Sequence, residues 1–215
     1  MDVIAINGSP RAKKSNTYQM LFALLEGMEQ TKAKTEIIHI ALMDIHYCLG
    51  CRFCKDHPGK CCINDDMNAF YEKLAQADWL IFGTPLHYFN MTGMMKNFID
   101  RLLPIDGKRG IRTKSQKILL VSPCGLLSTE QFSPLISTFK YMAKMTDREY
   151  LGEILRTTAN VQDEDKRKKY FQLLRLSGTK LIESGKIEKK LIEELHAPWM
   201  SIEEWERLNP WAKVE

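Results

Sequence analysis

Short apolar runs alternate with longer amphipathic stretches along most of this chain. Each apolar run is continuous, a pattern typical of strands that are buried on both faces of a parallel sheet. We expect five such strands, at residues 2–6, 35–42, 78–83, 116–122 and 149–155. Amphipathic stretches follow them and predict helices at residues 15–30, 67–77, 94–103, 129–145 and 163–184.

This alternation of strands and helices predicts a doubly wound α/β domain. Five strands suit the flavodoxin-like order 2-1-3-4-5, in which the ligand site lies beyond the carboxyl ends of strands one and three. At 215 residues, the chain is long enough for one such domain with extensions. We expect the domain to occupy residues 1–185, with an inserted cysteine loop at 47–65, and a tryptophan-rich extension to occupy residues 186–215.

Composition argues against two classes of partner. The formal net charge is only +4, and no basic stripe is interleaved with aromatic residues, so no nucleic-acid partner is expected. The sequence shows neither a signal segment nor an apolar run of about 18 residues, so we expect no membrane partner and a cytoplasmic location. Thiols are reduced in the cytosol, where clustered cysteines favour metal or redox chemistry over disulfides.

The loop after the first strand has the features of a phosphate site. Ser9 and Arg11 follow the strand, and Ser15, Asn16 and Thr17 open the next helix. Unpaired backbone donors and the positive end of the helix dipole favour a phosphate at such a position. The alternative is that Ser15 only caps the helix. The loop lacks the glycine patterns of ATP or GTP sites and of dinucleotide sites.

Two later loops should lie beside the first, because the carboxyl ends of parallel strands share one edge of the sheet. The loop after the fourth strand carries Cys124 and Gly125. Cys124 is expected near the ligand, either as a small buried apolar residue or as a participant in the chemistry. Gly125 permits a close approach of the backbone. The loop after the third strand reads Thr84-Pro85-Leu86-His87-Tyr88-Phe89-Asn90-Met91-Thr92-Gly93.

Five of the six cysteines lie in one short segment, with the spacing Cys48-x2-Cys51-x2-Cys54-x6-Cys61-Cys62. Three thiols at intervals of three residues, with a fourth further on, are typical ligands of an iron–sulfur cluster. The first three supply most of such a site, and either Cys61 or Cys62 supplies the fourth ligand; we take Cys61. Two alternatives stay open, a zinc site and a metal-free thiol loop that protects or regulates through reversible disulfides.

An acidic pair, Asp65 and Asp66, separates the cysteines from the next predicted helix. Carboxylates at such a position cap a helix and complement its dipole. We therefore expect a structural role for them, and we assign no catalytic side chain in this sequence.

Several of these segments together resemble a known family. They are Gly8-Ser9-Pro10-Arg11 with Ser15-Asn16-Thr17, the loop at 84–93, and Lys96-Asn97-Phe98-Ile99-Asp100-Arg101. The combination resembles the NADPH-dependent FMN reductase family of the flavodoxin-like superfamily. The cysteine segment, ending in Asp65-Asp66-Met67, is similar to the iron–sulfur flavoprotein branch of that family. The resemblance covers approximately residues 1–130.

The resemblance implies which residues hold an FMN cofactor. Its phosphate would lie against Ser9, Arg11, Ser15, Asn16 and Thr17. Its isoalloxazine ring would lie against Pro85, Leu86, His87, Tyr88 and Asn90, with Cys124 and Gly125 on the other side. His87 departs from the family pattern, in which an aromatic residue is more common.

The resemblance also implies an FMN-dependent oxidoreductase. Electrons would come from NAD(P)H or from a ferredoxin-type donor, and a [4Fe–4S] cluster on Cys48, Cys51, Cys54 and Cys61 would carry them singly. The acceptor would be a small molecule such as a quinone, a flavin, a nitro or azo compound, a metal ion or an oxygen species. Alternatives from other classes are a non-enzymatic electron carrier like flavodoxin and a zinc or thiol redox-sensing module.

Tryptophan is concentrated near the end of the sequence, at Trp199, Trp205 and Trp211. A tail of this composition is expected to be docked, and we favour docking on a second subunit over packing on its own domain. Members of the family that this chain resembles commonly dimerise, so we expect a homodimer or a higher homo-oligomer. Ser201 and Glu204 have the spacing of a capping box that opens a short helix.

Overall fold

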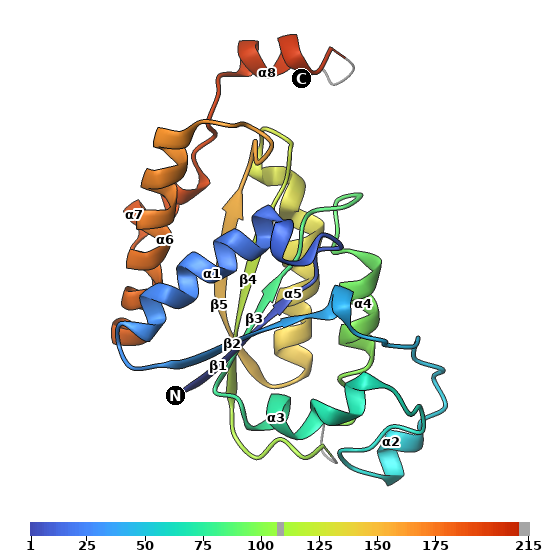
Figure 1. Ribbon diagram of the computed structural model, residues 1–215. Coiled ribbons are helices and arrows are strands. Elements are labelled where there is room, and N and C mark those ends of the chain that lie inside the picture. Colours follow the sequence, from blue (N-terminus) through green and yellow to red (C-terminus); the bar gives the residue numbers. More distant parts are fainter. Residues whose placement is uncertain (107–109, 211–215) are drawn as a thin grey trace.

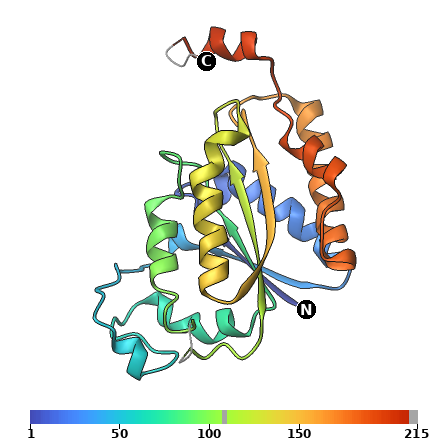
Figure 2. The same cartoon turned by 180° about the vertical axis from the view of Figure 1, so that it is seen from behind.

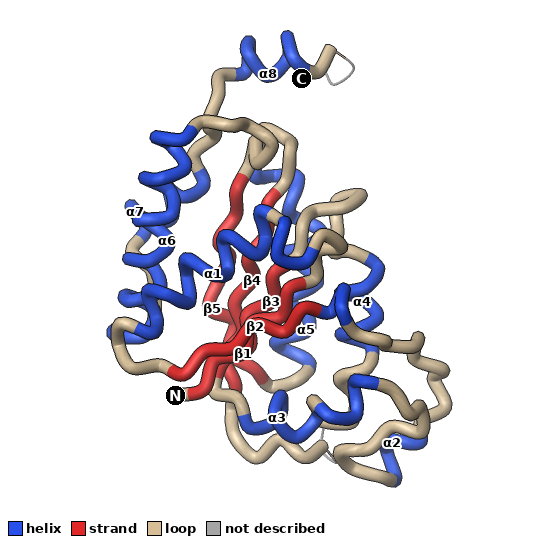
Figure 3. Tube along the Cα trace, in the orientation of Figure 1, coloured by secondary structure: helices blue, strands red, loops and turns tan. Residues whose placement is uncertain are grey.

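The computed structural model describes residues 1–106 and 110–210 and contains a five-stranded parallel sheet. The strand order β2-β1-β3-β4-β5 confirms the predicted flavodoxin-like doubly wound topology (Figures 1 and 3). The strands are β1 (Asp2–Asn7), β2 (Lys34–His39), β3 (Trp79–Gly83), β4 (Gln116–Pro123) and β5 (Arg148–Arg156).

Helices cover both faces of the sheet (Figures 1 and 2). One face carries α1 (Asn16–Glu29), α6 (Glu164–Ser184) and α7 (Lys189–His196). The other face carries α3 (Tyr71–Gln76), α4 (Gly93–Asp100) and α5 (Ser133–Met145). The shorter elements are α2 (Phe53–Asp56), α8 (Ile202–Leu208) and the 3-10 helices η1 (Ala12–Lys14), η2 (Ile40–Leu42), η3 (Asp66–Ala69) and η4 (Thr129–Phe132).

Each central strand contributes side chains to two hydrophobic cores. In β1, Ile4 and Ile6 belong to the core under α3, α4 and α5, whereas Val3 and Ala5 belong to the core under α1 and α6. Successive side chains of a strand point to opposite faces, so a strand covered on both sides must be apolar at every position. This is the physical reason for the continuous apolar runs in the sequence.

Four predicted elements differ from those observed by three or more residues at one end, and one of them is the helix expected at 94–103, which ends at Asp100. The strand expected at 35–42 ends at His39, and the next three residues form η2. The helix expected at 67–77 is divided into η3 and α3. The helix expected at 129–145 begins as η4, and α5 starts at Ser133 with a proline in its first turn. Proline suits the first turn of a helix but interrupts a longer one, so it divides this segment.

α1 and α6 pack backbone to backbone through two glycines. A Cβ atom at Gly27 would lie 1.8 Å from the carbonyl oxygen of Arg175, and one at Gly178 would lie 2.1 Å from that of Leu24. The starts of the two helices are also joined, because Arg167 Nη2 donates to Gln19 Oε1 at 3.4 Å. The close packing therefore keeps the first turns of α1 and α6 side by side.

The C-terminal segment packs on its own chain. Trp199 and Trp205 are 7% and 3% exposed, and Trp199 is part of the core that α1, α6 and α7 cover. The expectation that the tail docks on a second subunit is therefore wrong for these two residues, while Trp211 lies outside the described residues. The capping box of Ser201 and Glu204 is confirmed at the start of α8.

The boundary expected after residue 185 falls at Gly185, which ends α6 with a φ of 74°. Beyond it, Leu191 and Leu195 of α7 continue the same hydrophobic core. No helix within residues 1–106 and 110–210 is both long and apolar enough to span a bilayer.

We expect Gly27→Ala to lower the free energy of unfolding by about 1–3 kcal/mol, because the added methyl group meets the backbone of α6. Urea unfolding measures the change. Gly93→Ala is the matched control, since Gly93 also lies in a helix but nothing lies within 4 Å of the position of its added Cβ. Equal stabilities of the two variants would contradict the backbone contact between α1 and α6.

Candidate functional site

A cavity of about 500 Å³ lies at the carboxyl edge of the sheet. Loops that follow β1, β3, β4 and β5 form its walls, together with the first turns of α1 and α6. Its size is typical of a site for a small molecule or cofactor. The sequence-based expectation that the loops after strands one, three and four meet at one edge is therefore realised in the geometry.

Most of the residues expected at the cofactor line this cavity: Ser9, Arg11, Asn16, Thr17, Pro85, Leu86, His87, Cys124 and Gly125. Ser15, Tyr88 and Asn90 do not line it. Ser15 Oγ accepts from the backbone N–H of Tyr18 at 3.0 Å and donates to Ala12 O at 2.7 Å, so it caps α1 as the alternative interpretation expected. Tyr88 is fully exposed at the tip of a turn in which the backbones of His87 and Asn90 pair.

A network of buried groups fixes the first two loops against each other. Asn7 is fully buried, accepts from the backbone N–H of Ser9 at 3.1 Å and donates to Ala12 O at 3.1 Å. Thr92 Oγ1 donates to Gly8 O at 2.7 Å. A Cβ atom at Gly8 would lie 2.7 Å from Met95 Cε and 3.2 Å from Gly83 O, so only glycine fits between the loops.

The part of the cavity beside the start of α1 is suited to an anion. Thr17 is 1% exposed, and its Oγ1 has no hydrogen-bond partner among the described residues. Buried hydroxyls are rarely left unpaired, so this group calls for a ligand acceptor. Among the described residues that line the cavity there is no carboxylate, whereas four carry cationic side chains: Arg11, Lys14, Arg156 and Arg167. The hydroxyl, the cations and the helix dipole together fit a phosphate group.

The residues that sequence analysis missed come mainly from the end of β5 and the loop after it. Arg156 and residues 159–162 line the cavity, and Asn16 Nδ2 donates to Ala159 O at 2.7 Å. The rule that parallel strands share an edge applies to strand five as well. The position of Arg156 and residues 159–162 at the carboxyl end of strand five is therefore the sequence signal that identifies them.

Cys124 lies on the cavity wall and is buried. Burial raises its pKa to about 11, and its Sγ donates to Leu126 O at 3.7 Å. A thiol with a raised pKa is a poor nucleophile, which favours the packing role over a chemical one.

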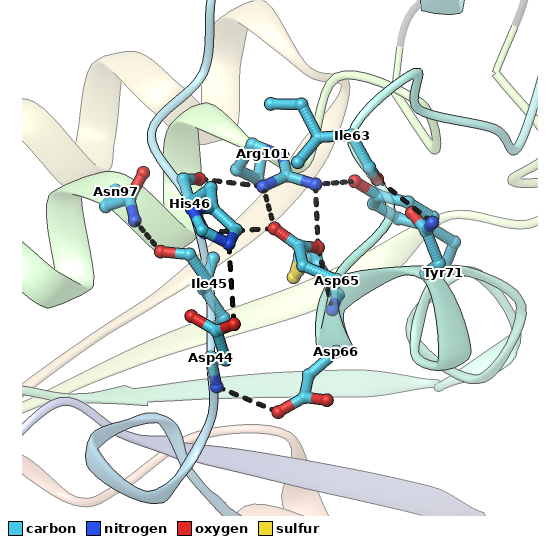
Figure 4. Close-up of polar contacts among 11 residues, drawn as sticks. Asp44, Ile45, His46, Ile63, Asp65, Asp66, Tyr71, Asn97 and Arg101 are labelled. Atoms are coloured by element: carbon cyan, nitrogen blue, oxygen red, sulfur yellow. Dashed lines mark hydrogen bonds and ion pairs between the residues drawn. The ribbon is translucent and has the colours of Figure 1, made fainter.

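The cysteine loop is closed at its base by a buried ion pair (Figure 4). Arg101, which follows α4, binds Asp65 through two contacts, Nη1 to Oδ2 at 2.6 Å and Nη2 to Oδ1 at 3.0 Å. Both side chains are at most 1% exposed. Arg101 Nη1 also donates to His46 O at 2.7 Å, and Asp65 Oδ2 accepts from His46 N at 2.9 Å. One guanidinium therefore holds both ends of the loop.

Neighbouring contacts strengthen the closure of the loop. We call residues 44–46 and 65–66, together with Asn97 and Arg101, the clamp. Asn97 Nδ2 of α4 donates to Ile45 O at 2.7 Å. Asp66 accepts from the backbone N–H of Asp44 at 2.8 Å and donates its own N–H to Asp44 O at 3.2 Å. Asp65 does cap η3, as expected, by accepting from Met67 N at 3.2 Å, but its ion pair with Arg101 was not foreseen.

Four cysteines of the loop, Cys48, Cys51, Cys54 and Cys61, line a second, small cavity of about 60 Å³ beside Arg101. Cys62 does not line it, and its Sγ lies 3.3 Å from that of Cys51. Within the part of the chain that the structure describes, no three metal-binding side chains converge on a point where one metal ion would sit. Four thiolates are the usual ligands of an iron–sulfur cluster, and four cysteines can also hold a structural zinc ion, so both types of centre remain compatible with these residues.

The two cavities lie at opposite ends of α4. Thr92 caps the start of this helix beside Gly8, whereas Arg101 follows its end beside the cysteines. The eight residues of α4 make it about 12 Å long. The cavities share no lining residue.

A model of the NADPH-dependent FMN reductase family matches residues 1–146. An iron–sulfur flavoprotein of Archaeoglobus fulgidus is 37% identical over 114 residues, which is 53% of this chain and 51% of that protein. One of Methanocaldococcus jannaschii is 34% identical over 105 residues, 49% of this chain and 53% of that protein. The chain thus spans about half the length of the curated relatives it matches.

Solved structures share the fold at low sequence identity. An NAD(P)H:quinone oxidoreductase from Methanothermobacter marburgensis superposes with a TM-score of 0.68 at 16% identity, over 84% of this chain and 96% of that one. An FMN-dependent NADH-azoreductase from Bacillus anthracis, in complex with FMN, gives 0.66 at 14% identity, over 84% of this chain and 99% of that one. At these identities, the likeness establishes the architecture alone.

We expect Arg101→Met to lower the free energy of unfolding by about 3–5 kcal/mol, because it leaves the buried Asp65 carboxylate without its partner. Lys96→Met is the matched control: it removes an exposed ion pair with Asp100 on α4 and should cost less than about 0.5 kcal/mol. Urea unfolding at neutral pH measures both. Equal losses in the two variants would contradict a clamp based on Arg101.

The ion pair between Asp65 and Arg101 also makes the stability of the fold depend on pH in the acid range. Burial acts to raise the pKa of Asp65, but hydrogen bonds and charge from Arg101 outweigh it and hold the pKa below the ordinary value of 3.8. The stabilisation is therefore complete above pH 3.8 and is lost as the pH falls through the lower native pKa.

Proposed function

The chain belongs to the NADPH-dependent FMN reductase family, and on that premise we propose that it is an FMN-dependent oxidoreductase. The observation that carries this proposal is the cavity at the carboxyl edge, with an unpartnered Thr17 hydroxyl and a cationic lining beside the start of α1. FMN, when bound, supplies hydride and single-electron transfer. The protein binds and orients the cofactor and controls access to it.

The phosphate of FMN would lie against the first loop and the start of α1. Asn16 and Thr17 line the cavity there, and Ser9 and Arg11 line it from the loop. Ser15 contributes by fixing the first turn of α1 rather than by contacting the ligand. Hydrogen bonds to a charged phosphate contribute about 1.5–3 kcal/mol each.

The isoalloxazine ring would lie between the loops after β3 and β4. Pro85, Leu86 and His87 form one wall, and Cys124 and Gly125 lie on the other. A Cβ atom at Gly125 would meet only the Asn160 side chain, at 3.6 Å, so this position leaves room for a flat ligand. Tyr88 and Asn90 belong to the exposed turn at the edge of this space, and we retain them as contacts of the ring's outer part.

We assign Cys48, Cys51, Cys54 and Cys61 as ligands of a [4Fe–4S] cluster, which supplies one-electron transfer when bound. Their shared cavity beside Arg101 supports the choice of Cys61 over Cys62. The names of the relatives, iron–sulfur flavoproteins, support the presence of a cluster but not the choice between these two cysteines. NAD(P)H or a ferredoxin-type protein is the proposed donor, and a quinone, a flavin or another small molecule is the proposed acceptor.

The three candidate functions, an enzyme, an electron carrier and a sensing module, predict different properties of the purified protein. Steady oxidation of NADPH or NADH with a quinone supports the enzyme, whereas a bound flavin that is reduced without turnover supports an electron carrier. A colourless protein with stoichiometric zinc supports a sensing module. A cytoplasmic location and a homodimer or higher homo-oligomer stay predictions.

We expect Thr17→Val to weaken FMN binding about 10- to 100-fold, because an isosteric side chain without the hydroxyl cannot bond the phosphate. Riboflavin, which has no phosphate, should bind the variant and the wild type equally. Quenching of flavin fluorescence measures both affinities. Thr138→Val, on the exposed surface of α5, is the control and should change neither. Unchanged FMN binding in Thr17→Val would contradict the assigned phosphate position.

We expect Cys61→Ser to lose most of its iron and sulfide after anaerobic purification, while Cys62→Ser keeps them. The reason is that only Cys61 shares a cavity with the other three thiols. Iron, sulfide and zinc are measured together with flavin in both variants. The reverse pattern would assign Cys62, and zinc in place of iron would overturn the cluster.

A further inference from the structure

Arg156 is a buried cation whose side chain makes no hydrogen bond or ion pair with any residue that the structure describes. It ends β5, its side chain is 3% exposed, and its Nε has no hydrogen bond with any described residue. Its contacts are aromatic: Cζ lies 3.9 Å from the centroid of the Trp199 ring and 5.4 Å from that of Tyr170. Stacking on aromatic rings stabilises a guanidinium but does not neutralise its charge.

Burial lowers the pKa of Arg156, and the nearby positive charge of Arg167 acts in the same direction. No ion pair joins Arg156 to a carboxylate within residues 1–106 and 110–210. Buried charges in proteins are usually paired. The missing partner is therefore expected from outside the chain.

Arg156 and Arg167 both line the large cavity. Arg167 reaches it from the first turn of α6, where its Nη2 donates to Gln19 Oε1 of α1 at 3.4 Å. The loop after β5 approaches the same place, because Asn16 Nδ2 donates to Ala159 O at 2.7 Å. The two arginines thus lie on the side of the cavity where α1 begins and where the Thr17 hydroxyl is unpartnered.

We propose that Arg156, supported by Trp199 and joined by Arg167, forms a subsite of this cavity that binds a phosphate monoester. The proposal rests on the proposed function for the identity of the ligand, and it adds residues beyond position 146, where the family model ends. A phosphate dianion supplies the charge that Arg156 lacks, and arginine suits it because its planar fork matches phosphate oxygens. Two ligands carry such a group: the 5′-phosphate of FMN and the 2′-phosphate of NADPH.

Trp199 is the positioning residue of this subsite. Its backbone N–H donates to Thr158 Oγ1 at 3.0 Å, and its carbonyl accepts from Lys166 Nζ at 2.6 Å. These bonds hold the indole over the guanidinium at the end of β5. The segment after α7 thereby becomes part of the binding site rather than a surface appendage.

The test compares paired ligands that differ by one phosphate, using the full-length protein. FMN and riboflavin affinities come from fluorescence of flavin released on dilution, and kcat/KM is measured for NADPH and NADH. Arg156→Met should reduce either the FMN-to-riboflavin affinity ratio or the NADPH-to-NADH ratio at least tenfold, and the ratio that falls identifies the phosphate. Arg156→Lys should retain part of the preference, and Trp199→Phe should reduce it less than Arg156→Met.

Arg175→Met is the matched control, since Arg175 also lies on α6 but pairs with Glu26 away from the cavity. It should change neither ratio. If Arg156→Met leaves both ratios unchanged, even if it weakens FMN and riboflavin equally, the subsite is refuted. Arg156→Lys and Arg167→Met provide the same comparison if Arg156→Met does not fold.

Binding of inorganic phosphate tests the subsite independently of the proposed oxidoreductase function. It should raise the thermal unfolding temperature of flavin-free wild type more than that of Arg156→Lys or Arg167→Met. A protein that binds phosphate in this way but no flavin would refute the proposed function and keep the subsite. In the opposite case, the protein binds FMN while the arginine substitutions change neither the stabilisation by phosphate nor the preference within either ligand pair. That result would refute the subsite and keep the proposed function.

Discussion

The parallel direction of all five strands is the constraint on which the site depends. It brings the carboxyl ends of β1, β3, β4 and β5 to one edge, so that loops distant in sequence become neighbours. The loops are then joined by specific bonds, such as those from Gly8 N to Gly83 O at 2.7 Å and from Cys124 N to Arg156 O at 2.8 Å. A cavity built in this way is preformed, which lowers the entropic cost of binding a rigid ring.

α4 serves as the common support of the two proposed centres. Its first turn is fixed to the phosphate loop by Thr92, and its last residues fix the cysteine loop through Asn97 and Arg101 (Figure 4). Asn97 and Arg101 in the segment 96–101 therefore hold the cysteine loop, a role that the helical periodicity of the segment does not reveal. The helix that joins these two attachment points is eight residues, or about 12 Å, long.

The sequence was sufficient for the architecture because each central strand has to be apolar on both faces. The loops after β1, β3 and β4 were predictable for the same reason, since the order of a parallel sheet places them together. Ser15 was ambiguous from the sequence, because one residue type serves both as a helix cap and as a phosphate ligand. Its bond to Tyr18 N shows that it caps the helix.

Long-range polar pairs could not be predicted. Asp65 and Arg101 are 36 residues apart, and each has an ordinary local explanation as a cap or a helix residue. Arg156 and Trp199 are also far apart in sequence, and their stacking depends on how the C-terminal segment crosses the end of β5. The tryptophan-rich tail indicated docking, but its composition does not distinguish its own chain from a second one, and the chosen partner was wrong for Trp199 and Trp205.

The central claim is that the carboxyl edge encloses phosphorylated flavin. Its most direct test is chromatography of the flavin released when the purified protein is denatured, with reconstitution by added FMN where the content is low. The account predicts close to one FMN per chain, bound without a covalent link. A protein that carries no flavin and does not bind added FMN would contradict it.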